Sequence, residues 1–132
     1  MKKKLIPILI AAVVVVAGAL YFLVFNSGGA EKPVVYTEYS PGEFFVTNVD
    51  GTTNLLKTTL VLVLDTDETG GMTAANTRIR DTIIAVLRSI DLDTLLDVDM
   101  ADSVKKRIAD AVNARLEITN VVDVLYNDFV VQ

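Results

Sequence analysis

Residues 57–65 read KTTLVLVLD, and positions 60–64 within this segment are all apolar. An unbroken apolar run is typical of a strand that is buried on both faces, and such a strand lies in the interior of a sheet. We therefore predict that this segment is the central strand of a folded domain. The acidic, glycine-containing stretch at residues 67–71 marks its end.

Two short segments of β-strand character precede this strand. Residues 34–39 read VVYTEY and residues 44–49 read FFVTNV, and both are rich in β-branched and aromatic side chains. The Ser-Pro-Gly sequence at residues 40–42 separates them, and an Asp-Gly pair at residues 50–51 predicts a turn before the central strand. We expect two short strands here.

Residues 121–131 (VVDVLYNDFVV) return to β-strand character near the end of the chain. Val122, Val124 and Tyr126 alternate, as the residues on one face of a strand do. Asn127 and Asp128 then shift Phe129 to the other parity, which predicts a β-bulge.

Two amphipathic helices are predicted between the central and the last strand. Within residues 73–90 and 100–116, large apolar residues recur at helical spacing: Ile79, Ile83, Val86, Leu87 and Ile90 in the first, and Val104, Ile108, Val112 and Leu116 in the second. A short turn capped by Asp93 is expected between them. The order β, β, β, α, α, β predicts an α+β domain, with helices covering one face of a small, mostly antiparallel sheet.

Residues 5–25 (LIPILIAAVVVVAGALYFLVF) contain no charge. A helix of about 20 residues crosses the hydrocarbon core of a bilayer, so we predict a transmembrane helix from Leu5 to Phe25, with Tyr21 and Phe25 near its far interface. The basic tip, residues 1–4, should stay in the cytoplasm because positive charges favour that side, and the rest of the chain is then extracytoplasmic. Its charges come from Lys2, Lys3 and Lys4.

Residues 26–33 (NSGGAEKP) have the small, polar composition of a linker, so the domain of residues 34–132 is held close to the membrane. The alternative is a cleaved signal peptide, because Ala17-Gly18-Ala19 has the small-x-small form of a cleavage site. We favour the uncleaved anchor. Cleavage after Ala19 would leave the strongly apolar residues 20–25 as the mature N-terminus, and the apolar run is longer than a signal peptide needs.

The chain has 132 residues and contains neither Cys nor His. Thiol and imidazole nucleophiles, Ser-His triads, zinc sites and disulfides are therefore absent, and we expect no catalytic residue, no cofactor and no metal. All 17 acidic residues follow residue 25, against nine basic ones. This acidic balance disfavours nucleic acid as a partner.

Two groups of acidic residues are candidate sites for a bound cation or for catalysis. Residues 65–70 match the first half of a calcium loop, but Asn76 stands where the loop needs a bidentate glutamate. Between residues 91 and 102 lie five aspartates, and we interpret Asp93 and Asp99 as helix caps because each precedes a helical run. Asn113, beside the apolar stripe of the second helix, is expected to bond a neighbouring backbone.

Several segments, in this order, resemble the flagellar basal-body-associated FliL family over nearly the whole chain. They are the Lys-tipped span, Phe45-Val46-Thr47-Asn48-Val49-Asp50, Leu55-Leu56-Lys57, Arg80-Asp81-Thr82-Ile83-Ile84, Leu95-Leu96, Asn113 and the C-terminal Val124-Leu125-Tyr126-Asn127-Asp128-Phe129-Val130-Val131-Gln132. The family-motif residues, interpreted as structural, are Asn48, Arg80, Asp81, Asn113, Tyr126, Asp128, Phe129 and Gln132. The chain departs from the family pattern at Val49, Leu125 and Asn127.

The resemblance implies a single-pass inner-membrane protein with a periplasmic domain like that of stomatin-type (SPFH) proteins. It also implies assembly into a homo-oligomeric ring and association with the stator units and other proteins of the flagellar basal body. The role it implies is mechanical support of flagellar rotation in swimming and swarming, without enzymatic activity.

Two other functions fit parts of the sequence. A membrane-anchored ligand-binding or sensor domain would have to signal through the span, yet only four residues precede it. A calcium-dependent enzyme would need a complete set of calcium ligands. The set is incomplete here, because Asn76 stands at the position of the bidentate glutamate.

We predict that the mature protein keeps its span. Because residues 20–25 make a poor mature N-terminus, the intact mass of membrane-extracted protein should include residues 1–19. A mass that lacks these residues would show a cleaved signal peptide and a secreted domain.

Overall fold

A computed structural model describes residues 3–27 and 33–132. The chain divides into two units, Met1–Pro33 and Val34–Gln132, and each is described by itself. In the first unit, helix α1 runs from Leu5–Ser27 and so includes the first two residues of the expected linker. Residues 28–32 of that linker, as well as Met1 and Lys2, lie outside the described residues.

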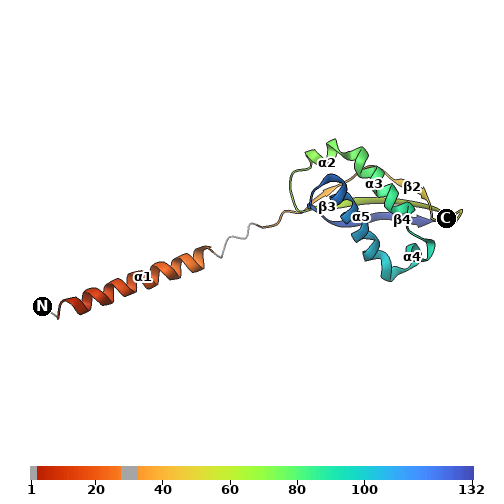
Figure 1. The fold of residues 1–132 in the computed structure, drawn as a ribbon. Helices are drawn as coiled ribbons and strands as arrows, with labels where there is room; N and C mark the ends of the chain where they lie inside the picture. The colour runs from red at the N-terminus through yellow and green to blue at the C-terminus, as the bar shows by residue number, and fades with distance from the viewer. Residues whose placement is uncertain (1–2, 28–32) are drawn as a thin grey trace. The chain divides into compact units, whose positions relative to one another are not determined.

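The second unit is built on one long central strand, β3 (Leu55–Leu64), with which the other three strands pair antiparallel (Figure 1). Strand β4 (Val121–Val131) follows one edge of β3 along nearly its whole length. Strands β1 (Thr37–Tyr39) and β2 (Phe45–Asn48) pair with opposite ends of β3, so they share its other edge. The predicted central strand is confirmed, while residues 34–36 lie outside β1.

The prediction that β3 is buried on both faces is wrong. Its even-numbered residues are buried, whereas Val61 and Val63 are half-buried and Leu55 and Lys57 are exposed. The helices cover only one face of the sheet, as Figure 1 shows. A strand with an unbroken apolar run can therefore lie in a sheet that is covered on one face only. Neighbouring strands then shield its outward side chains in part.

The helices form a layer on the buried face. Helix α2 (Gly70–Ala74) and helix α3 (Asn76–Arg88) follow β3, helix α4 (Leu92–Leu96) and a 3-10 turn (Val98–Met100) come next, and helix α5 (Ala101–Leu116) leads to β4. The core lies between the two layers and includes Leu60 and Leu62 from β3, Ile79 and Ile83 from α3, and Ile108 and Val112 from α5. The predicted α+β class, with helices on one face of an antiparallel sheet, is confirmed.

The helix caps differ from those expected. Asp91, and not Asp93, caps α4 by accepting a 2.7 Å hydrogen bond from the Thr94 N–H, and Asp97, and not Asp99, caps the 3-10 turn through the Asp99 N–H at 2.9 Å. The cap of α4 lies two residues earlier than expected because α4 starts at Leu92. Asp97 caps a 3-10 turn that the sequence pattern does not predict, and α5 starts at Ala101 without a side-chain cap, so the prediction that Asp99 caps this helix is wrong. Hydrogen bonds from Thr94 lower the pKa of the Asp91 carboxyl below its ordinary value.

Strand β4 contains two bulges. The pairing skips Asn127 between Asp128 and Tyr126, which confirms the bulge predicted there, and it also skips Val122. The second bulge makes one expectation wrong: Val122 is exposed, and Val121 is buried on the helix-covered face with Val124. Bulges let a long edge strand follow a strongly twisted neighbour and interrupt the regular pattern that another chain could pair with.

The junction between β1 and β2 is held by one side chain of α3. The Arg80 guanidinium donates hydrogen bonds to the carbonyl oxygens of Pro41 (3.0 Å) and Phe44 (3.1 Å), and it lies 4.3 Å from the centre of the Phe45 ring. Gly42 passes directly beneath it with φ +144°, and a Cβ at this position would overlap the guanidinium. We call this set of contacts the Arg80 clasp. It joins β1 to β2 on the edge of the sheet that these two short strands share.

We predict that the Arg80 clasp stabilises the domain. Arg80→Ala removes two charge-assisted hydrogen bonds and should lower the free energy of unfolding by about 2 kcal/mol, or the melting temperature by roughly 10 °C. Arg80→Lys keeps the charge but loses the two-pronged geometry, so it should cost about 1 kcal/mol. Thermal melts of the full chain in detergent micelles, followed by circular dichroism, measure both losses.

The matched control is Arg78→Ala, because the guanidinium of Arg78 makes no hydrogen bond within the described part of the chain and is exposed. It should change the melting temperature by no more than about 2 °C. An equal loss in the Arg78 and Arg80 variants would contradict the clasp.

Candidate functional site

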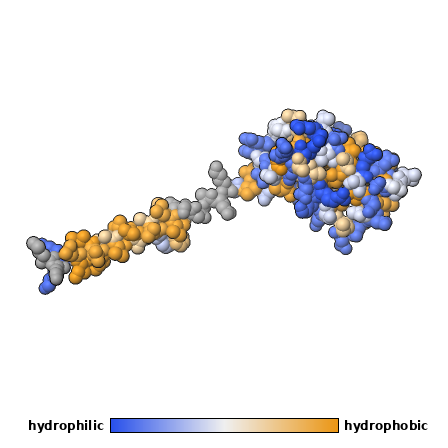
Figure 2. Space-filling view, viewed as in Figure 1, coloured by the Kyte–Doolittle hydropathy of each residue, from blue (hydrophilic) through white to orange (hydrophobic). Residues whose placement is uncertain are grey.

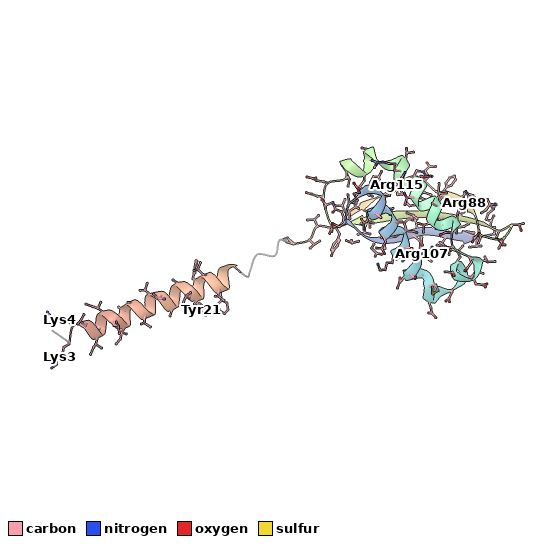
Figure 3. The ribbon with its side chains drawn as sticks, in the orientation of Figure 1. Lys3, Lys4, Tyr21, Arg88, Arg107 and Arg115 are labelled. Carbon is pink, nitrogen blue, oxygen red and sulfur yellow. The ribbon has the colours of Figure 1, made fainter. Side chains whose placement is uncertain are left out.

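Helix α1 has the properties of a membrane span. Its segment Leu5–Phe25 is long and apolar enough to cross a bilayer. Every side chain of that segment is exposed, and the face of the helix that Figure 2 shows is apolar. Because the segment contains no charged residue, no side of the helix is charged. Such a helix is stable where lipid covers it. Lys3 and Lys4 stand at its start and Tyr21 lies towards its other end (Figure 3). The Tyr21 ring stacks on Phe25 with 4.3 Å between ring centres.

The family-motif residues do not meet in one place in the second unit. Arg80 belongs to the clasp, while the side chains of its neighbour Asp81 and of Asn48 at the end of β2 are exposed and make no hydrogen bond in the described chain. The others lie on α5, on β4 and, in the case of Gln132, directly after β4. The fold therefore distributes these residues over structural joints and does not gather them into a reaction centre.

Asn113 fastens the end of α5 to the beginning of β4. Its side-chain amide donates a hydrogen bond to the Val121 carbonyl (2.8 Å), and its oxygen accepts one from the Val121 N–H (3.0 Å). Between the two residues, the chain turns sharply at Glu117 with φ +55°, and the Ile118 N–H returns to the Asn113 carbonyl at 3.0 Å. Asn113 thus supplies the backbone bond expected of a buried amide, and it sets where β4 starts.

Asp128 and Gln132 act through their main chain. The buried Thr58 hydroxyl donates to the Asp128 carbonyl at 2.6 Å, beside the bulge, where the regular ladder is interrupted. Gln132 exchanges two backbone hydrogen bonds of 2.8 Å with Leu55 at the end of the sheet. In both residues the main chain makes the bond that holds the sheet. Any side chain with a suitable backbone preference could therefore maintain it.

Tyr126 and Phe129 do form part of a cavity. Their rings lie 5.1 Å apart, and they line an apolar groove of about 200 Å³ between α4 and β4. We call it the α4–β4 groove. Its other main lining side chains are Leu95, Leu96, Val98 and Val104.

The phenol of Tyr126 is unusual for a half-buried tyrosine. Its hydroxyl is buried and has no hydrogen-bond partner in the described chain, and burial raises the pKa of Tyr126 to about 12. The Lys105 ammonium lies 5.4 Å from the centre of the ring. A buried hydroxyl without a partner costs about 1–3 kcal/mol, so a group that accepts its proton would be stabilised here.

Sequence reasoning did not find this groove, because its most exposed members, Leu96 and Val98, lie at the end of a short predicted turn and just beyond it, outside both predicted amphipathic helices. Leu96 is 62% exposed and Val98 is 87% exposed. The signal was present: α4 is a helix of five residues with three leucines, more apolar positions than such a short element can bury.

The open face of the sheet is a second candidate surface. Val46, Leu125 and Val130 are each more than one third exposed on it, and the half-buried Val61 lies between them. Lys57 lies among them, with its ammonium 4.9 Å from the centre of the Phe44 ring. Exposed apolar side chains of this number favour a surface that meets another molecule.

The acidic residues weighed as ligand sites do not converge. Asp65, Asp67 and Glu68 are exposed on the loop after β3, and no group of three acidic side chains in residues 3–27 and 33–132 is arranged to hold a metal ion. Of the aspartates between residues 91 and 102, Asp97 lines the α4–β4 groove, and the others are spread over α4, the 3-10 turn and the start of α5.

Seven basic residues lie on helices α3 and α5. Figure 3 labels Arg88 on α3 and Arg107 and Arg115 on α5. The Arg107 guanidinium donates to the Ser89 hydroxyl at 3.1 Å, which joins the two helices at the surface. Lys106 and Asp110, 2.7 Å apart and well exposed, form the one ion pair within the described residues.

Comparison with known proteins agrees with this arrangement. No curated protein matches the chain. The family model of the flagellar basal body-associated protein FliL matches residues 39–132, which include strands β2 to β4, the helical layer, the last residue of β1 and every motif residue of the second unit. The chain therefore belongs to the flagellar basal body-associated FliL family.

Proposed function

We propose that this protein is a membrane-anchored accessory of the flagellar motor that associates with the stator units and supports rotation during swimming and swarming. Residues 1–4 lie in the cytoplasm, α1 crosses the inner membrane once, and residues 34–132 lie in the periplasm. The observation that carries this proposal is the FliL family match over the whole ectodomain, next to a helix that can span a membrane.

The chemistry of the ectodomain supports binding in place of catalysis. Its motif side chains make structural hydrogen bonds to backbone groups, as Arg80 and Asn113 do. Its conspicuous surfaces are apolar: the α4–β4 groove and the open face of the sheet. Apolar surface offers contact area to a partner and provides no acid, base or nucleophile.

We also propose that the protein assembles into a ring in the membrane. Because α1 ends at Ser27, only residues 28–33 separate it from the ectodomain, and six residues reach at most about 21 Å. Anchoring at this distance holds every ectodomain in one layer with one orientation. This raises the effective concentration for lateral contacts without adding any contact. A head-to-tail contact between identical subunits closes into a ring when its rotation permits.

Deletion of the gene should impair motility without impairing growth. The reason is that a motor accessory supports torque generation and takes no part in metabolism. Swimming speed and swarm expansion at several viscosities measure the effect. Motility indistinguishable from the parent strain at every load would contradict a role in the motor.

Lengthening the linker should weaken both assembly and motility support. We expect an insertion of ten Gly-Ser residues after Gly29 to leave the melting temperature of the ectodomain unchanged, because the linker sequence is small and polar and provides no large apolar side chain for a core. In-membrane cross-linking between copies should fall by about tenfold, since a longer linker dilutes the ectodomains over a larger volume.

The matched control replaces residues 28–32 with a Gly-Ser segment of equal length, and it should cross-link and swim like the parent. If the lengthened variant also behaves like the parent, proximity to the membrane does not drive assembly.

A further inference from the structure

The α4–β4 groove combines an apolar floor with an exposed apolar wall. Tyr126 and Phe129 form the floor from β4, and Leu96 and Val98 stand at the wall with 62% and 87% of their surface exposed. Its volume of about 200 Å³ is somewhat larger than a cavity that binds benzene, so it can hold one aromatic or branched aliphatic side chain.

The rim of this groove is strongly acidic. Asp97 lines it, the exposed Asp93, Asp99 and Asp102 each lie next in the chain to a residue that lines it, and no basic residue occurs between residues 89 and 104. Lys105, which lies over the Tyr126 ring, is the one cation next to the groove within the described chain. None of these four aspartates forms an ion pair with a described residue. The groove therefore attracts positive charge next to an apolar anchor.

Tyr126, which lines the groove, also has a hydroxyl group that needs a hydrogen-bond acceptor. Its buried hydroxyl has no acceptor in the described chain, although a phenol buried in a protein normally donates a hydrogen bond. A peptide that enters the groove brings backbone carbonyl oxygens, which are suitable acceptors.

These features discriminate among occupants. A membrane surface with anionic phosphates is repelled by the aspartates of the rim. A second copy of this chain has two basic runs. Residues 2–4 adjoin the membrane helix on the cytoplasmic side of the proposed topology, and beside residues 105–107 the flanking Val104 and Ile108 are buried, so neither run offers the groove an apolar anchor beside its charges. A peptide with an apolar side chain between Lys or Arg residues satisfies the floor, the rim and the tyrosine together.

We infer that the α4–β4 groove docks a short segment of a partner protein in which a large apolar side chain lies between basic residues. The inference rests on the proposed function, because it names the chemistry of the segment through which a motor partner would be bound. It assigns the contact to the helix-covered side of the domain, at α4 and β4, and not to the open face of the sheet.

A test uses the full chain in zwitterionic nanodiscs and the peptide acetyl-KWKLK-amide. The chain contains no Trp, so tryptophan fluorescence reports the peptide alone. We expect a blue shift and saturable binding with a dissociation constant on the order of tens of micromolar. The peptide acetyl-EWELE-amide should bind at least tenfold more weakly, because the same anchor then carries the wrong charge.

Two variants locate the site. Val98→Arg places a cation on the groove wall and should weaken binding by at least tenfold, whereas Val46→Arg, at a valine that is also exposed but lies on the open face, should change it less than twofold. The double variant Asp93→Asn with Asp99→Asn should weaken binding by about threefold to fivefold and reduce its salt dependence. All these positions are exposed, so circular dichroism should show unchanged folding.

Three outcomes would overturn the inference: equal binding of the two peptides, unchanged binding to the Val98 variant, or loss of binding in the Val46 variant alone. The first would mean that any apolar group, such as a lipid chain, enters the groove. Because binding is measured on purified protein, its failure leaves the proposed motor role intact, and only the motility of the deletion strain decides that role.

Discussion

The sheet of the second unit, residues 34–132, is held together by β3, since β1, β2 and β4 each pair with it. The buried side chains of this single strand, from Leu56 to Leu64, form the floor on which α3 and α5 pack. A sheet that is only three strands wide cannot bury two faces with two helices, so one face stays open. The apolar surface of that open face follows from the same constraint.

Because all strands pair with β3 alone, the regular backbone pairing is interrupted at several places. Individual polar side chains bond the backbone groups at these interruptions. The edge opposite β4 is divided between β1 and β2, and Arg80 bonds the backbone that leaves one and enters the other. Asn113 sets the start of β4, and the Thr58 hydroxyl satisfies the Asp128 carbonyl beside a bulge. Each is a polar side chain bonded to a backbone group that regular pairing leaves free.

This accounts for the chemistry of the FliL signature in this chain. Arg80, Asn113, Asp128 and Gln132 specify how the elements join, two of them through the main chain alone. The proposed partner surface is the α4–β4 groove, whose exposed wall is formed by Leu96 and Val98. Of the family-motif residues interpreted as structural, Tyr126 and Phe129 also line this groove, because they pack against the core and face it.

Local patterns in the sequence determined the span, the α+β order of elements, the central position of β3 and the bulge at Asn127. Each follows from the spacing of apolar residues within one segment, which the backbone geometry of helices and strands dictates. The tertiary structure alone decided that Val61 and Val63 stay partly open, that Val121 replaces Val122 in the core, and that Asp91 and Asp97 are the caps. It also decided that α4 and β4, some 30 residues apart, enclose a groove. Burial at these positions depends on which distant element covers them, and no local period contains that information.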